Sequence, residues 1–255
     1  MDNQRINKLL QSIETLSANQ QEWIELIVKK FQQSANFYRN AESDLITECV
    51  LQYFGDNLKI HHSFSNEPFT KDKFEFALER AINQCHGSKV AVLATRGNPG
   101  HDITIGDKRF SLKTQADRNI LVNIIHISKF HELGKGKWGD DPNDLVGLRE
   151  QFFFHMQSYD RILTFRRLSP KDKKFWRYEL IEIPKALLEE ARNGVFEMKM
   201  NSTQYPKPGY CYVIDSERRI KFSLYFDGGT ERKLQIKQLD KNLCFVHATW
   251  EFSKD

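Results

Sequence analysis

The sequence predicts an α/β protein of the α+β type, with a mixed central sheet flanked by helices, a helical region before it and a β-rich part after it. Apolar residues recur at helical spacing in residues 2–16 and 18–34. Short apolar or alternating segments separated by turns follow, and from residue 195 onward only strand and turn signals remain. We expect the 255 residues to form one domain. Its expected parts are a helical region (1–60), a catalytic core (61–190) and a β-rich part (191–255).

Composition supports a well-packed interior and leaves the partner open. With 40% hydrophobic and 12% aromatic residues, the chain has enough apolar material for a substantial core, which argues against disorder. Its net charge of +4 permits binding to nucleic acid but does not require it. Charge alone therefore assigns no function.

The cysteines and the hydropathy pattern predict a cytoplasmic protein. Residues 1–5 are polar, so we expect no signal peptide, and no apolar run approaches membrane-spanning length. Four cysteines are dispersed and form no CxxC pair: Cys49, Cys85, Cys211 and Cys244. We expect reduced, buried thiols rather than a zinc site or disulfides, and no membrane partner.

Helices are expected to dominate the chain as far as its first histidine pair. Ser43 is the expected cap of a third helix that reaches Tyr53 and ends at Gly55. His61 and His62 follow on a segment expected to be extended, where adjacent side chains point to opposite sides. This geometry argues against a metal bound by both imidazoles.

A further helix is predicted from Lys71 to residue 85 or 86. Thr70 is the expected N-cap, with aromatic residues on either side of it that fit a hydrophobic staple. Gly87 suits the position after the last turn. The β-branched and apolar residues 89–94 then predict a buried strand.

The stretch from residue 97 to residue 116 contains the signals of a functional hairpin. Asn98-Pro99-Gly100 predicts a turn, and a strand (101–105), the turn Gly106-Asp107 and a second strand (108–114) follow. Antiparallel pairing brings Asp102 near Ser111 and Lys113. A carboxylate beside an ammonium fits a Mg²⁺-dependent nuclease, in which the carboxylate binds the metal and the lysine orients or deprotonates water. The alternative is a solvated hairpin with a surface ion pair of little energetic value.

Strands and short helices are expected to alternate after the hairpin. Residues 120–127 are apolar at nearly every position and predict a central strand, followed by a loop with lysines among glycines. Asp141-Pro142 predicts the start of a helix that extends to about Tyr159. The other expected elements are paired strands (161–166 and 175–183), a short helix between Pro184 and Gly194, and strands 218–226 and 232–239.

Several stretches of this chain are similar to nuclease sequences. The region of Asp102 and Lys113 resembles the Asp…(Glu/x)-x-Lys core of the PD-(D/E)xK nuclease superfamily, and the chain more closely resembles the SmaI-like type II restriction endonucleases. The shared stretches are Asn98–Ile105, Leu112–Thr114, Glu132–Gly136, Glu182–Lys185, Pro206–Tyr210, Phe222–Gly229 and Glu231–Lys237. The similarity extends from about Gly55 to Phe252. One position departs from the superfamily pattern, because Ser111 stands where a Glu or Asp is usual.

This resemblance implies a type II restriction endonuclease of a restriction–modification system, with the restriction-endonuclease-like fold. Mg²⁺ is the expected cofactor, bound by Asp102 and the main-chain carbonyl of Leu112, because hard oxygen ligands suit this ion. Lys113 positions the attacking water. The resemblance also implies a CCCGGG-like, G/C-rich site cut at its centre to give blunt ends with a 5′-phosphate.

Cutting both strands of double-stranded DNA at a palindrome argues for a homodimer with one active site per strand. A cognate DNA methyltransferase is expected in the same system, without being a stable partner.

Glu75 is the expected source of the missing carboxylate, because related nucleases place an acidic residue on the equivalent helix. At about 100° per residue, Glu75 lies roughly 90° from the centre of the buried stripe of its helix, and Glu79 about 130°. We therefore expect Glu75 to bind metal with Asp102, and Glu79 to be a solvated surface charge. The alternative for Glu75 is an ion pair with a nearby Lys or Arg.

Lysine, arginine and glutamine side chains in the second half are candidate DNA contacts, given the resemblance. The strand 232–239 presents Lys233, Gln235 and Lys237 on one face, and Leu234, Ile236 and Gln238 on the other. Lysine and glutamine can donate to phosphates and base edges. The full candidate set is Lys129, Lys135, Lys137, Lys207, Arg232, Lys233, Gln235 and Lys237. Without the resemblance, a solvated loop and an edge strand explain these residues equally well.

Two other functions stay open at this stage. Because Ser111 removes an expected carboxylate, the chain could be a sequence-specific DNA-binding protein, or a repair or nicking nuclease of the same fold that makes no double-strand cut. It could also be a structural protein whose Asp102–Lys113 hairpin has no chemical role. Cleavage and binding of plasmid DNA, with and without Mg²⁺, distinguish these functions.

Overall fold

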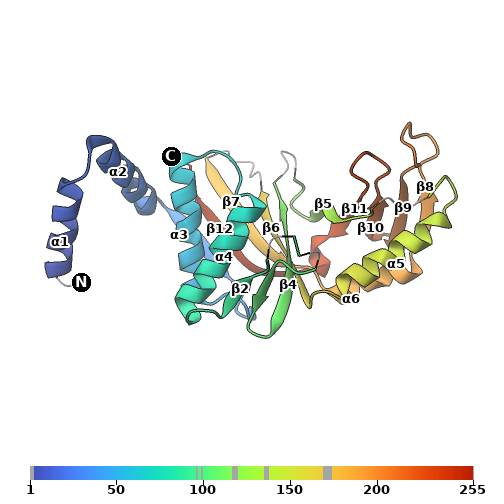
Figure 1. Cartoon of the computed structure of the whole chain (residues 1–255), viewed down its shortest axis with the longest axis horizontal. Coiled ribbons are helices and arrows are strands. Elements are labelled where there is room, and N and C mark those ends of the chain that lie inside the picture. The colour runs from blue at the N-terminus through green and yellow to red at the C-terminus, as the bar shows by residue number, and fades with distance from the viewer. Residues whose placement is uncertain are drawn as a thin grey trace.

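Two β-sheets organise the chain, one with seven strands and one with five. The structure is a computed structural model that describes residues 3–95, 97–98, 100–116, 120–134, 138–168 and 174–254. In Figure 1 the helices α3 and α4 lie in front of the larger sheet, and α5 and α6 lie against the smaller one. The predicted α+β class is confirmed.

The larger sheet is mixed. Its strands, in spatial order, are β1 (Ala35–Arg39), β12 (Phe245–Ser253), β7 (Phe175–Glu182), β6 (Arg161–Leu168), β4 (Lys108–Gln115), β3 (Ile103–Ile105) and β2 (Ala91–Leu93). Only β4 and β6 pair in parallel, and all other neighbours in this sheet are antiparallel. The expected hairpin of β3 and β4 and the expected pair β6–β7 are both confirmed.

The smaller sheet is antiparallel. Its strands, in spatial order, are β5 (Ile124–Glu132), β11 (Lys233–Asp240), β10 (Ile220–Phe226), β9 (Gly209–Ile214) and β8 (Val195–Met198). The prediction of a central strand over 120–127 is wrong, because the strand begins at Ile124 and lies at the edge of this sheet.

A buried arginine accounts for the late start of this strand. The Arg166 guanidinium donates to the carbonyl oxygens of Leu121 (2.9 Å) and Ile124 (2.7 Å), so these acceptors are bonded outside a strand ladder. Its other donors reach the Gln115 amide oxygen (2.9 Å) and the Glu179 carboxylate (2.6 Å). Strands of the larger sheet and the start of the smaller one are thereby joined through a fully buried charge pair.

A bulge changes the alternation predicted for β11. Leu234 and Ile236 face the core as expected, but Gln238 has a positive φ of 56° and is exposed. The register with β5 shifts between Ile236 and Leu239, so Leu239 joins the buried face of Leu234 and Ile236, on which Gln238 was expected to lie.

Six α-helices accompany the sheets within the described residues. They are α1 (Asn3–Glu14), α2 (Ala18–Gln32), α3 (Glu48–Phe64), α4 (Lys71–His86), α5 (Asp144–Met156) and α6 (Lys185–Glu189), and two short 3₁₀ turns, η1 (Glu190–Asn193) and η2 (Lys241–Leu243), follow α6 and β11. The ends of α4 are as predicted, since the Thr70 hydroxyl accepts from the Lys73 N–H and Gly87 follows the last turn. α5 begins two residues after the predicted Asp141-Pro142, because the Asp141 carboxylate accepts from the Asn143 N–H in a preceding turn. Within the described residues, no helix has the length and hydropathy needed to cross a membrane.

The predicted third helix is wrong at both ends. Thr47, rather than Ser43, caps α3, and the helix continues past Gly55 to Phe64. The Ser43 hydroxyl instead shares a hydrogen bond with His247 Nδ1 (2.8 Å). Gly55 is buried, and a Cβ there would lie 2.2 Å from the Phe37 ring, so this glycine provides space for packing and does not end the helix.

His61 and His62 lie in the last turn of α3, not on an extended segment. The His62 ring stacks on Trp176 with centroids 3.9 Å apart and shares a hydrogen bond with the Tyr178 hydroxyl (2.9 Å). Burial lowers the pKa of His62 to about 3. His62 is therefore a neutral core residue at physiological pH.

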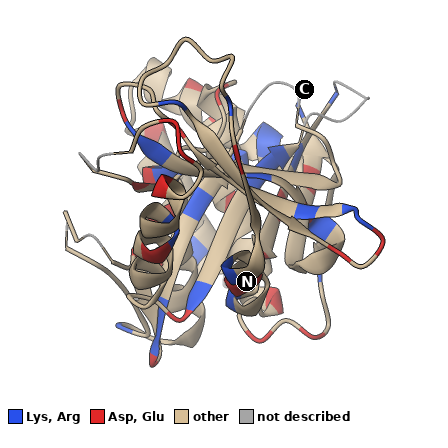
Figure 2. Ribbon diagram, turned by 90° about the vertical axis from the view of Figure 1, so that its right-hand side faces the viewer, with Lys and Arg blue, Asp and Glu red and all other residues tan. Residues whose placement is uncertain are grey.

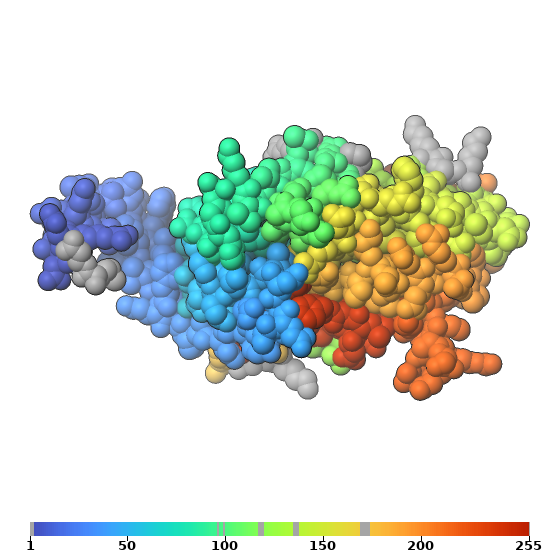
Figure 3. Space-filling model, turned by 90° about the horizontal axis from the view of Figure 1, so that it is seen from below, coloured from blue at the N-terminus to red at the C-terminus, as the bar shows by residue number. Residues whose placement is uncertain are grey.

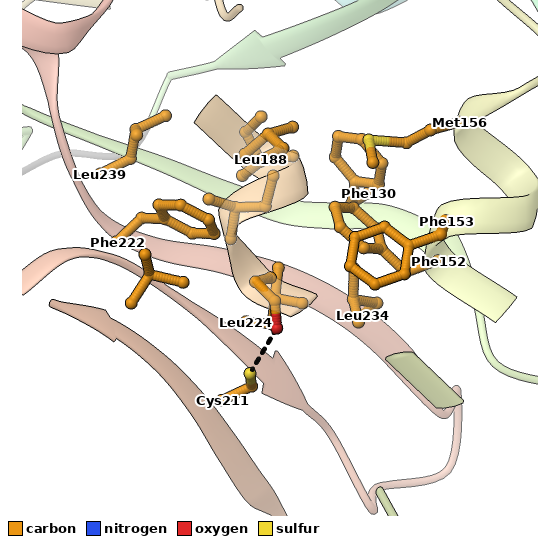
Figure 4. Packing of buried hydrophobic residues seen from close by; sticks show 14 of the residues in the cluster. Phe130, Phe152, Phe153, Met156, Leu188, Cys211, Phe222, Leu224, Leu234 and Leu239 are labelled. Carbon is orange, nitrogen blue, oxygen red and sulfur yellow. Dashed lines mark hydrogen bonds between the residues drawn. The ribbon is translucent and has the colours of Figure 1, made fainter. Parts of the chain in front are cut away.

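Each sheet has its own hydrophobic core. One core packs α3 and α4 on the larger sheet through residues such as Phe54, Phe74 and Phe165. The other packs α5 and α6 on the smaller sheet, and Figure 4 shows Phe130, Phe152 and Leu234 within it. Lys113 and its neighbours on β4 lie between these two cores, at the junction of the sheets.

Cys49 and Cys85 form a disulfide between α3 and α4, so the expectation that all four cysteines are reduced is wrong. The two residues are 36 positions apart and became neighbours only because the two helices pack against each other. Cys211 and Cys244 are free thiols, as expected, and burial raises the pKa of Cys211 to about 11.

Candidate nuclease site

The hairpin of β3 and β4 holds the Asp102 carboxylate at the end of β3. The Asp102 N–H donates to the Phe110 carbonyl (2.8 Å), which continues the ladder by one residue beyond Ile103. One carboxylate oxygen accepts from the Leu112 N–H (2.6 Å) and lies 3.4 Å from the Ser111 hydroxyl. Charge-assisted bonds of this kind fix the orientation of a carboxylate. The sequence correctly placed Asp102 beside Ser111.

The Leu112 carbonyl faces the same side as Asp102. The Arg109 carbonyl accepts from the Asp160 N–H, so odd-numbered residues of β4 face β6. The N–H and C=O of one extended residue point to the same edge, and the Leu112 N–H already reaches Asp102. Its carbonyl oxygen is therefore directed toward the space beyond the end of β3.

Lys113 shares a face of the sheet with Ser111, because alternate residues of a strand point the same way. Its ammonium lies 5.2 Å from the centroid of the Phe130 ring, and no described residue accepts a hydrogen bond from it. Burial lowers the pKa of Lys113 to about 8, although the Asp102 charge acts to raise it. Both the burial and the pKa differ from those of a surface lysine.

Glu75 and Asp102 approach each other through a shared cation. The Lys71 ammonium lies 2.7 Å from an Asp102 carboxylate oxygen and 3.1 Å from a Glu75 carboxylate oxygen. Burial raises the pKa of Glu75, Lys71 lowers it, and the Asp102 charge raises it further. The ion pair considered as the alternative for Glu75 is thus present, and it joins Glu75 to Asp102. Lys71 had no assigned role in the sequence, although it precedes Glu75 by one helical turn.

Glu79 is not the solvated surface charge that was expected. Its carboxylate accepts from the Leu93 N–H (3.1 Å), at the end of β2. The bond connects α4 to the edge strand, a contact that helical angles on α4 alone do not reveal.

A cavity of about 350 Å³ opens beside Lys113. Its lining includes Lys71, Lys113, Lys129 and His131. Three cations around one cavity suit an anionic ligand such as a phosphodiester. His131 also lines a second hollow of about 500 Å³, together with Glu132, Glu150 and His155 among others.

Four buried polar side chains in the region of Asp102 and Lys113 were not identified from the sequence. The His131 and His155 rings stack 4.8 Å apart, and burial lowers the pKa of each to about 4. Within the described residues, His131 Nε2, His155 Nε2, Tyr159 Oη and Thr164 Oγ1 are buried without a hydrogen-bond partner. Burial raises the pKa of Tyr159, and the Asp102 charge adds to the effect. These residues become candidates only because folding places them near Asp102 and Lys113, so no sequence pattern identifies them.

The donors around Asp102 fit a divalent cation of the Mg²⁺ type. The Asp102 and Glu75 carboxylates and the Leu112 carbonyl are hard oxygen donors, the kind that Mg²⁺ prefers, and Mg²⁺ is commonly held by one or two carboxylates with water and substrate phosphate. The structure gathers no cluster of three or more His, Cys, Asp or Glu side chains in the residues that it describes.

The candidate DNA contacts have differing environments. Lys129 pairs with Glu132 (2.7 Å) and Lys233 with Glu231 (3.1 Å). The Lys207 ammonium donates to the Ser202 carbonyl (2.5 Å). Lys135 and Lys137 lie outside the described residues, as does Pro99 of the predicted turn.

On β11 itself the three predicted side chains are not equivalent. Lys237 lies 3.5 Å from the centroid of the Tyr225 ring, and Arg232 lies 5.3 Å from that of Trp138. Gln235 is buried and donates to the Asp227 carboxylate (3.1 Å). Figure 2 shows basic and acidic segments interspersed over the molecule, which agrees with the small net charge.

The fold and the site together define the class of protein: an α+β nuclease with a carboxylate and a lysine on one β-hairpin. The chain belongs to the SmaI family of type II site-specific deoxyribonucleases, whose family model matches residues 9–252. It is 45% identical over 215 residues to the "Type II restriction enzyme SmaI" of Serratia marcescens, and the alignment covers 84% of each chain. No solved structure matches this chain. The protein is thus a type II restriction endonuclease, which acts on double-stranded DNA.

Proposed function

We propose that this enzyme is a PD-(D/E)xK nuclease that uses Mg²⁺ to cut both strands of a short palindromic, G/C-rich site. The observation that carries the proposal is the β3–β4 hairpin, which directs Asp102 and Lys113 to one face beside a cation-lined cavity. The similarity to SmaI favours a CCCGGG-like sequence, cut at its centre to leave blunt ends with 5′-phosphates.

Asp102, Glu75 and the Leu112 carbonyl would hold the metal. When bound, the ion supplies charge stabilisation to the scissile phosphate and lowers the pKa of water. The hydrogen bond from the Leu112 N–H keeps one Asp102 oxygen in place, and Lys71 keeps Glu75 close to Asp102. Ser111 contributes its hydroxyl to the Asp102 carboxylate in place of the usual acidic side chain.

Lys113 orients the attacking water and accepts its proton. An amine with a pKa of about 8 is partly neutral in mildly alkaline solution, and the neutral amine can act as a base. Its place above the Phe130 ring restricts where the ammonium can go. Tyr159 Oη and Thr164 Oγ1, buried without a partner in the described residues, are further groups that can hydrogen-bond to water in this region.

We assign the DNA-binding surface to Lys129, Lys207, Arg232, Lys233 and Lys237, and include Lys135 and Lys137, which follow β5 in the sequence and lie outside the described residues. Lys129 lines the cavity beside Lys113, so a phosphate there would be near the proposed metal ligands. Gln235 supports this surface by bonding to Asp227. A base contact from Gln235 would require it to exchange Asp227 for a base edge.

On this proposal the enzyme is a cytoplasmic homodimer, and each 255-residue chain is one endonuclease domain. One active site per chain and two strands to cut favour two copies on a palindrome. A DNA methyltransferase of the same specificity would protect host DNA without binding this chain stably.

Digestion of a plasmid of known sequence tests the proposal. With Mg²⁺, we expect discrete fragments whose ends map to one palindrome, and no fragments with a chelator or with Asp102→Ala. Nicked circles without linear product would instead support the nicking alternative. Specific binding by the wild type without any strand scission in Mg²⁺ would refute the mechanism. An unchanged melting temperature of Asp102→Ala shows that its loss of cutting does not come from unfolding.

A further inference from the structure

The N-terminal arm, defined as residues 3–32, exposes an unusual amount of apolar surface. None of the residues of α1 is buried. The exposed fractions are 61% for Leu9, 54% for Leu10 and 56% for Trp23. Ile6, Leu26 and Phe31 are also exposed. In Figure 1 the two helices form an inverted V at one end of the molecule, and in Figure 3 the arm extends beyond the main body.

The arm is held in a defined shape. Ser17 and Gln20 form a capping box at the start of α2, and the Gln21 amide donates to the carbonyls of Ile13 (3.1 Å) and Leu16 (3.2 Å) across the bend. At its other end, the buried Lys30 donates to the Lys254 carbonyl (2.7 Å) after β12. The apolar residues of α1 and α2 are therefore presented on a preorganised element.

Opposite charges accompany the apolar residues on the two helices. Residues 5–10 read Arg-Ile-Asn-Lys-Leu-Leu, and residues 22–27 read Glu-Trp-Ile-Glu-Leu-Ile. At an offset of 17 positions, an apolar residue matches Ile6 and another matches Leu9, while each cation of α1 matches an acid of α2. None of these four charged residues takes part in a salt bridge within the described part of the chain.

We infer that the N-terminal arm binds the arm of a second copy of this chain, with α1 of one copy parallel to α2 of the other. A parallel arrangement at this offset matches Leu9 with Leu26 as well as the charges, whereas the antiparallel register that matches the same charges places Leu9 opposite Gln21. Within one chain the short turn at Ser17 reverses the direction, so α1 cannot align in parallel with its own α2. A twofold axis solves this problem, because it places each α1 beside the partner's α2 in an isologous interface.

The size of the arm is adequate for such an interface. A standard interface uses roughly 20–30 residues on each side, with a buried apolar centre and a charged rim. The arm contributes a similar number of residues, with leucine and tryptophan at the centre and Arg5, Lys8, Glu22 and Glu25 beside them. Resting on the proposed function, this assembly would supply the second Asp102 centre that the second DNA strand needs.

The oligomeric state of the full-length enzyme, measured without DNA or metal by sedimentation, tests the inference. We expect a dimer for the wild type and at least about 30-fold weaker association for Leu9→Glu or Trp23→Glu, since a charge would enter the apolar centre. The matched control is Met200→Glu, because Met200 is also 56% exposed but lies outside the arm. It should leave the dimer intact.

Charge reversal tests the pairing of α1 with α2. Arg5→Glu with Lys8→Glu should weaken the dimer, and so should Glu22→Lys with Glu25→Lys, while all four changes in one chain should restore it. A monomeric wild type, or an unchanged dimer in the Leu9 and Trp23 variants, would overturn the inference. Failure of the proposed function is seen separately, as absence of cleavage in proteins whose dimer behaves as expected.

Discussion

Replacing Lys113 by methionine is expected to abolish cleavage and to stabilise the fold. The substitution removes the ammonium and keeps an unbranched side chain that can contact the Phe130 ring. Burial lowers the pKa of Lys113 from 10.5 to about 8, so at neutral pH the folded protein holds a charge that its surroundings disfavour. At 1.36 kcal/mol for each pKa unit, this corresponds to a destabilisation of roughly 3 kcal/mol. We expect Lys113→Met to recover about 1–3 kcal/mol of it.

The pH dependence gives the sign of the effect. Because the folded state releases this proton near pH 8 and the unfolded state near pH 10.5, the unfolded chain binds more protons between these values, and stability rises with pH there. The cost of the buried charge is therefore constant below pH 8 and disappears above about pH 10.5. The advantage of Lys113→Met should follow the same course.

Thermal unfolding at pH 7 and pH 10 measures the effect. For a chain of this size, 1 kcal/mol corresponds to about 2–4 °C, so we expect a rise of at least about 3 °C at pH 7 and a smaller one at pH 10. Lys108→Met is the control, because the side chain of Lys108 is 54% exposed and its neighbour Asp107 is on the surface. A Lys113→Met protein that melts at or below the wild-type temperature at pH 7 would refute this account of the site.

Four further outcomes are expected. Asp102→Ala and Lys113→Ala should each reduce cleavage below detection and leave specific DNA binding largely intact, and near-normal cutting by either variant would place the active site elsewhere. Glu75→Gln should lower the cleavage rate and raise the Mg²⁺ requirement, whereas Glu79→Gln, which keeps an oxygen for the Leu93 N–H, should resemble the wild type. Alanine at Lys207, Arg232, Lys233 and Lys237 together should weaken binding to all DNA sequences. Each of these side chains that binds a phosphate should lower the slope of DNA affinity against salt concentration by about 1 when it is removed. An unchanged slope would show that this surface does not contact DNA. Arg166→Ala should cost about 3–5 kcal/mol in urea unfolding, because it leaves Glu179 buried without its main partner, and a cost below about 1 kcal/mol would contradict the proposed link between the sheets.

The elements that the sequence predicted well are those whose hydrogen bonds are local. Thr70 caps α4 through the N–H of Lys73, three residues away, and Gly106-Asp107 closes a hairpin whose strands are adjacent in the chain. The same locality brings Asp102 beside Ser111, so the position of the carboxylate followed from turn residues and strand alternation. The sequence failed where a distant partner decided the outcome. Gly55 suggested a helix end, but the Phe37 ring from another element occupies the space above it.

Tertiary structure alone decided the electrostatics of the site. The chain itself, through its short-range patterns, determined the α+β class, the β3–β4 hairpin and the Asp102–Lys113 pair. Only packing placed Lys71 between Glu75 and Asp102, across 31 residues, and put Lys113 above Phe130 with its pKa lowered to about 8. It also delayed the start of the strand in the apolar run 120–127 to Ile124, because Arg166, 42 or more residues away, donates to the Leu121 and Ile124 carbonyls. Local bonds depend on neighbours that the sequence shows, whereas burial and long-range pairing depend on which surfaces meet after folding.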